Sequence, residues 1–84
     1  MSMADAAYDV LRGASDGRAL TNRQIAEIAV KRRLVRGELA DVSRSVRVAL
    51  VREQRHRDSE GLRPRIRTVG PGQYTLGERK LEPE

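Results

Sequence analysis

Cysteine is absent from this chain, and histidine occurs only once, as His56. The absence of cysteine excludes a disulfide framework and any thiolate metal site, and it is compatible with a reducing compartment. A zinc site would need several histidine or acidic ligands in close spacing, and the sequence contains no such group. No nucleophile stands beside a base, and no pair of acidic residues suggests a catalytic cleft. We therefore expect a protein without metal or cofactor that is not an enzyme.

Aromatic residues and long apolar runs are also scarce. Tyr8 and Tyr74 are the only aromatics among 84 residues, so the core must be built from Val, Leu, Ile and Ala. The apolar run Val48–Val51 is far shorter than the roughly 18 residues that span a membrane. The N-terminus MSMADAAYDV has neither the basic region nor the long apolar stretch of a secretory signal. These absences predict a soluble cytoplasmic protein with one small domain and no membrane partner.

Positive charge, by contrast, is abundant and concentrated. The chain has 17 basic and 12 acidic residues, a formal net charge of +5. Residues 44–67 hold eight arginines against three acidic residues, so this segment carries a net charge of +5 and the remainder is neutral. Such a balance points to an anionic partner, such as nucleic acid or a membrane surface, whereas a surface that only keeps a domain soluble normally mixes both signs.

Two segments of the N-terminal half have the apolar spacing of helices. The first covers residues 3–14, with Ser2 as its N-cap. The second covers about residues 22–34 and opens with Thr21-Asn-Arg-Gln24, the pattern of a capping box. In that motif the side chains at the two ends satisfy each other's exposed backbone N–H groups, so the start of the second helix is strongly indicated.

A third helix is predicted to begin at Glu38 or Asp41 and to end near Arg57. A turn around Gly37 separates it from the second helix. Its apolar residues recur at helical spacing and therefore share one stripe, which should face the core. The stripe consists of Leu39, Val42, Val46, Ala49 and Leu50.

The opposite side of the third helix carries arginine. With about 100° of rotation per residue, Arg44 and Arg55 point almost directly away from the apolar stripe, and Arg47 and Arg52 lie on its flanks. Arginine can donate two hydrogen bonds to guanine O6 and N7 or to a phosphate, so these four residues are candidate DNA contacts. The alternative is a solvated arginine-rich face without a ligand.

Val48 and Val51 lie on the same outer half of the third helix. They could contact thymine methyl groups, pack beneath a neighbouring element or bind a protein partner. Packing is the favoured interpretation.

Residues 65–76 have the pattern of a β-hairpin. The first strand alternates polar and apolar residues, Gly70-Pro-Gly72 provides the turn, and Tyr74 and Leu76 face inward on the return strand. An isolated hairpin is barely stable in water, so this one must pack on the helices. The segment Ala19-Leu20 could add a third strand.

Arg65 and Arg67 alternate with Ile66 and Thr68 on the first strand of this hairpin. Both arginines are therefore expected to face out of the sheet, where they could hold DNA phosphates.

Three helices followed by a hairpin predict a mainly α, α+β fold, the winged helix-turn-helix, over residues 1–76. The hairpin is then the wing, and the third helix is the candidate reader of the major groove. Residues 77–84 have no periodicity and are predicted to be a disordered tail.

Two motifs carry a resemblance to a known family. The segment Leu20-Thr-Asn-Arg-Gln-Ile-Ala26, a basic third helix and the segment Val69-Gly-Pro-Gly-Gln-Tyr-Thr-Leu76 occur in an order that resembles the HARE-HTH winged-helix domain, over roughly residues 4–76. That family includes the N-terminal domain of bacterial RNA polymerase delta subunits, restriction-type proteins and eukaryotic chromatin factors. The resemblance implies DNA recognition or contacts with the transcription machinery.

The sequence thus predicts a DNA-binding transcription regulator or accessory factor, monomeric and associated with the nucleoid. Two alternatives stay open. One is a module that docks on RNA polymerase or another regulator without touching DNA. The other is a basic domain that binds RNA or a membrane surface. The predicted DNA contacts are Arg44, Arg47, Arg52, Arg55, Arg65 and Arg67.

Overall fold

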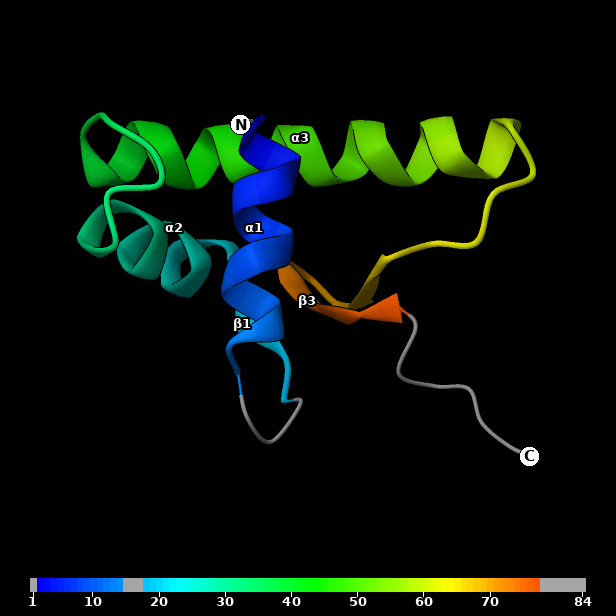
Figure 1. Cartoon of the computed structure of the whole chain (residues 1–84), viewed down its shortest axis with the longest axis horizontal. Helices are drawn as coiled ribbons and strands as arrows, with labels where there is room; N and C mark the ends of the chain where they lie inside the picture. The colour runs from blue at the N-terminus through cyan, green and yellow to red at the C-terminus, as the bar shows by residue number, and fades with distance from the viewer. Residues whose placement is uncertain (1, 15–17, 78–84) are drawn as a thin grey trace.

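The computed structural model describes residues 2–14 and 18–77. Within these residues the chain forms three helices and one antiparallel sheet of three strands (Figure 1). This is the predicted α+β layout of a winged helix, with the hairpin at the C-terminal side. The elements are α1 (Met3–Arg12), β1 (Leu20–Thr21), α2 (Asn22–Lys31), α3 (Leu39–Ser59), β2 (Ile66–Gly70) and β3 (Gln73–Leu76).

Capping boxes define where the first two helices begin. The backbone N–H of Asp5 donates to the Ser2 hydroxyl over 3.1 Å, and the N–H of Gln24 donates to the Thr21 hydroxyl over 3.0 Å. In each box the residue at the third helical position accepts a bond in return from the backbone of the cap. Both predicted helix starts are confirmed, because each box satisfies two N–H groups that the helix itself cannot pair.

The helices α2 and α3 end in the same way but with different residues. After α3, the N–H of Leu62 donates to the carbonyl of Arg57 over 2.8 Å, and Gly61 adopts a positive φ of 71°. After α2, the N–H of Leu34 donates to the carbonyl of Ala29 over 2.9 Å, but here Arg33 occupies the left-handed position, with φ of 60°. These are Schellman motifs, in which glycine is the usual left-handed residue. The second helix therefore ends at Lys31, three residues before the predicted Leu34.

The sheet has the strand order β1-β3-β2, and all neighbours are antiparallel. Leu20 of β1 pairs with Tyr74 of β3, which confirms a third strand here, over Leu20–Thr21 rather than the predicted Ala19-Leu20. On the other side Tyr74 pairs with Thr68, and a bulge follows before Gly70. Pairing on both edges fixes β3 as the central strand and attaches the hairpin to the segment that leads into α2.

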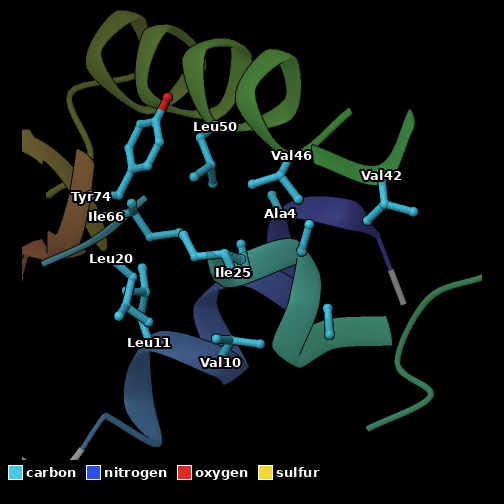
Figure 2. Packing of buried hydrophobic residues seen from close by; sticks show 13 residues of the cluster. Ala4, Val10, Leu11, Leu20, Ile25, Val42, Val46, Leu50, Ile66 and Tyr74 are labelled. Carbon is cyan, nitrogen blue, oxygen red and sulfur yellow. The ribbon is translucent and has the colours of Figure 1, made fainter. Parts of the chain in front are cut away.

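One core joins the helices to the sheet. Val46 and Leu50 of α3 are completely buried, Ile25 of α2 is equally buried, and Tyr74 is 2% exposed. In Figure 2 the Tyr74 side chain extends from the sheet toward α3, where Leu50 and Val46 point inward. The predicted apolar stripe of α3 is confirmed, with Leu39 and Ala49 at its partly buried margins. This packing fixes the rotation of α3 about its axis and decides which side chains remain outside.

The third helix, predicted from Glu38 or Asp41 to about Arg57, extends from Leu39 to Ser59. Two further boundary predictions concern the ends of the chain. The helix α1 ends at Arg12 rather than at residue 14. Residues 78–84 of the predicted tail lie outside the described residues, while Gly77 is buried. In the part of the chain that the structure describes, no helix is both long enough and apolar enough to cross a membrane.

Candidate nucleic-acid interface

The outer face of α3, opposite the buried stripe, is an open surface of arginine and valine. Its residues extend over eleven helical steps, a length of about 16 Å at the rise of an α-helix. Their side chains line a shallow groove of about 530 Å³. We call this surface the outer face; its residues are Arg44, Arg47, Val48, Val51, Arg52 and Arg55.

All four arginines predicted on this helix are exposed and are brought together on the outer face. Among the described residues Arg44 has one acidic partner, Asp41, over 3.3 Å, and both side chains are more than 70% exposed. An ion pair with that exposure is worth little and is readily exchanged for another anion. Arg47, Arg52 and Arg55 form no ion pair within residues 2–14 and 18–77. The outer face thus presents charge that the described part of the protein does not neutralise.

The valines of the outer face are also exposed, Val48 by 44% and Val51 by 39%. The favoured interpretation, that they pack beneath another element, is therefore wrong. The reason lies in the rotation of α3: the hairpin lies on the buried side and one flank of the helix, where Gln54 donates to the hydroxyl of Thr68 over 3.0 Å. No described element covers the outer face.

Arg65 corrects a second expectation. Its guanidinium donates to Glu53 over 2.6 and 2.8 Å and to Asp5 over 2.7 Å, and it lies over the Tyr8 ring, 4.8 Å from the ring centre. Only 24% of the side chain is exposed, so Arg65 does not face out of the sheet. It precedes β2, which begins at Ile66, and is therefore free of the alternation of the strand. These contacts join the start of the hairpin to α1 and α3.

Arg65 and its carboxylate partners Glu53 and Asp5 stabilise one another's charged forms. Hydrogen bonds with Glu53 and then with Asp5 raise the pKa of Arg65, which is charged at every relevant pH. The hydrogen bond from Arg65, followed by those from Ser2, lowers the pKa of Asp5 below its ordinary value of 3.8. Arg65 is therefore neutralised within the fold and is a poor candidate for contact with a phosphate.

Arg67 is placed as expected, exposed on β2. With Gln54, Asp58 and Thr68 it lines a depression of about 300 Å³ between α3 and the hairpin. It lies beside the flank of α3 rather than on the outer face. Of the two arginines predicted on the wing, Arg67 alone is positioned to meet a ligand that approaches α3.

Asn22 is a positioning residue that sequence reasoning missed. Its side-chain amide donates to the hydroxyl of Ser43 over 2.8 Å, and its backbone N–H donates to the carbonyl of Gly72 over 3.1 Å. The start of α2, the tip of the hairpin and the N-terminal half of α3 are thereby held together. No local pattern could identify this contact, because Ser43 and Gly72 are distant from Asn22 in the sequence. From the sequence alone, Asn22 is only the first residue of a helix.

The connection between α2 and α3 adds further positive charge. Lys31 at the end of α2 and Arg33 and Arg36 in the connection are all exposed. The connection leads directly into the N-terminus of α3, at the left of Figure 1. These cations therefore lie beyond the Arg44 end of the outer face.

A metal site is not evident in the described part of the chain: it contains no group of three or more His, Cys, Asp or Glu side chains that could hold an ion. The chemistry of the outer face is instead that of an arginine surface with an apolar centre.

Comparison with known proteins gives no relatives. No family model, curated protein or solved structure matches the chain.

Proposed function

We propose that this protein binds duplex DNA, with the outer face of α3 in the major groove, and acts as a transcription regulator or accessory factor at the nucleoid. The observation that carries the proposal is the charge of that face: four exposed arginines stand on one side of one helix, and only Arg44 has an acidic partner in the described part of the chain. The partner that this arrangement favours is a polyanion.

The shape of the surface favours a duplex in particular. The major groove of B-DNA is about 12 Å wide and admits an α-helix, and arginine fits both guanine O6/N7 and phosphate. The wing stands beside α3 and offers Arg67, while Asn22 holds the hairpin tip against the helix. The helix and the wing can then contact one duplex together, as in other winged helices.

The transcriptional role rests on the resemblance to the HARE-HTH domain in the segments 20–26 and 69–76. The observed winged-helix layout is compatible with that resemblance. We extend the family's association with DNA and transcription to this chain as a hypothesis.

The test is binding of the full chain to a duplex of mixed sequence, measured by fluorescence anisotropy across a salt series. Binding by contacts to phosphate should weaken as a power of the salt concentration, with a slope of about −0.9 per phosphate contacted. Arg52→Ala should make that slope shallower. Arg12→Ala removes the same charge from α1, outside the outer face, and should leave the slope unchanged. Absence of duplex binding by the wild-type protein at about 50 mM salt would reject the proposal.

A second candidate function is docking on RNA polymerase or another regulator without contact to DNA. The observation that favours it is the exposed pair Val48 and Val51 within a rim of arginines. An apolar centre with a polar rim is also the anatomy of a protein–protein interface. This candidate becomes the better account if the wild-type protein fails to bind duplex DNA at low salt.

A further inference from the structure

We propose that the outer face of α3 selects duplex DNA whose major groove presents thymine methyl groups close to guanines, with Val48 and Val51 contacting the methyls. This inference rests on the proposed binding of DNA and specifies which bases the face prefers.

The two valines are not explained by the fold. The other large apolar residues at the centre of α3, such as Val46 and Leu50, are completely buried, whereas Val48 and Val51 are 44% and 39% exposed. Valine does not improve the helix itself, because its branched side chain lowers helix propensity relative to Ala, Arg or Lys. Their position suggests a role toward a ligand.

The chemistry of the major groove limits what an apolar side chain can recognise there. Each base edge offers hydrogen-bond donors and acceptors, and the one apolar group among the four bases is the C5-methyl of thymine. A valine that faces the groove has a favourable contact with thymine and leaves the polar edges of the other bases unpaired. Val48 and Val51 would therefore discriminate among bases without a hydrogen bond.

The spacing of the valines fits neighbouring base pairs. Side chains three residues apart on a helix have Cβ atoms about 5–6 Å apart, and successive bases on a strand are about 3.4 Å apart along the helix axis. Val48 and Val51 can thus contact two neighbouring positions within one short stretch of DNA sequence.

The arginines around the valines determine which bases are preferred next to the thymines. Arg44 and Arg52 lie four residues on either side of Val48, and Arg47 and Arg55 lie four residues on either side of Val51. Residues at this separation are neighbours on a helix surface. Because guanine is the base that arginine recognises best, we expect the outer face to prefer DNA in which thymine and guanine are close together.

Replacement of thymine by uracil gives a direct test, because it removes the methyl and leaves the charge and the hydrogen-bonding groups unchanged. Two duplexes are compared at one salt concentration, one of alternating thymine and guanine on one strand, and its counterpart with uracil for thymine. The wild-type protein should bind the uracil duplex about fourfold more weakly for each methyl contacted, the loss expected for one apolar group of that size.

The double variant Val48→Ala/Val51→Ala should bind both duplexes with equal affinity. The matched control, Arg52→Ala, should bind both more weakly but keep the preference for thymine. Thermal melting of each variant checks that it is folded, and removal of exposed valines should leave the melting temperature nearly unchanged.

Two outcomes would overturn the inference while the proposed function stands: equal affinity of the wild-type protein for the two duplexes, or a preference for thymine that survives in the valine double variant. The first means that no methyl is contacted, and the second means that another surface contacts it. A wild-type protein that binds neither duplex at low salt would instead reject DNA binding itself.

Discussion

The guanidinium of Arg65 donates two hydrogen bonds to the carboxylate of Glu53, over 2.6 and 2.8 Å, in a bidentate pair. Glu53 is the less exposed partner, with 15% of its side chain accessible. A further bond to Asp5 brings in the first turn of α1, so three elements meet at one cation. This cluster attaches the hairpin to the helices independently of the apolar core.

We predict that Arg65→Ala destabilises the fold by about 1–2 kcal/mol. Hydrogen bonds to charged groups contribute about 1.5–3 kcal/mol, and the partial exposure of this cluster lowers the effect. Urea unfolding monitored by circular dichroism measures the loss. The salt dependence of DNA binding should be unchanged in the same variant, because Arg65 is already neutralised by carboxylates. A slope shallower by about one unit would show that Arg65 contacts a phosphate after all.

The stability of the protein should also fall at acidic pH through Asp5. Its pKa is lowered in the folded state, chiefly by the hydrogen bond from Arg65. The unfolded chain therefore binds a proton at a higher pH than the folded chain does. The stabilisation by Asp5 is complete above the unfolded pKa, ordinarily 3.8, and is lost as the pH falls through the lower folded value.

The measurement is the free energy of unfolding of wild type and Asp5→Asn as a function of pH. The difference between the two proteins should be constant from pH 7 to about pH 5 and should shrink below the ordinary pKa of aspartate. A difference that stays constant down to about pH 2 would mean that the ionisation of Asp5 does not contribute to stability.

The sequence was sufficient to predict the features that depend on local patterns. The N-cap at Ser2 and the capping box at Thr21 are local patterns, so both helix starts could be predicted. The apolar stripe of α3 predicted the buried Val42, Val46 and Leu50, and the alternation within the hairpin predicted the buried Tyr74, since both follow from the geometry of one element. These patterns gave the order of elements and much of the core.

The features that were missed depend on contacts between distant segments. Arg65 was assigned to the solvent side because its partners Asp5 and Glu53 come from two other elements. Val48 and Val51 were expected to pack, but the position of the hairpin relative to α3 leaves them exposed. The rotation of a helix against its neighbours is a property of the whole core, and a local pattern does not contain it.

Arg33 provides a prediction of increased stability. It occupies the left-handed position at the end of α2 with φ of 60°, where the matching position after α3 is Gly61. For a residue with a Cβ this conformation destabilises the folded state by about 1–2 kcal/mol. For glycine the cost is about 0.5–1 kcal/mol, because its unfolded chain has more conformational freedom to lose. Arg33→Gly should therefore raise the free energy of unfolding by about 0.5–1 kcal/mol.

The control for this prediction is Arg33→Ala, which removes the same charge but keeps the Cβ. Its free energy of unfolding should equal that of the wild type or be slightly lower. If alanine stabilises the protein as much as glycine does, the gain arises from relief of charge repulsion among Lys31, Arg33 and Arg36 rather than from the backbone.

The last prediction separates the reading of bases from contact with the DNA backbone. Arg44 and Arg47 lie in the N-terminal half of α3, the part of a recognition helix that reaches base edges in helix-turn-helix proteins, whereas Arg67 stands on the wing. Arg44→Ala or Arg47→Ala should reduce discrimination between duplexes by about 1–3 kcal/mol at the affected base pair. Arg67→Ala should weaken binding to every duplex by a similar factor and make the salt slope shallower by about one unit.

Anisotropy titrations of several duplexes at a series of salt concentrations distinguish the two effects, because base contacts change the ranking of the duplexes and phosphate contacts do not. A uniform loss of affinity in all three variants, with the ranking preserved, would mean that α3 lies along the backbone of the duplex and does not read its sequence.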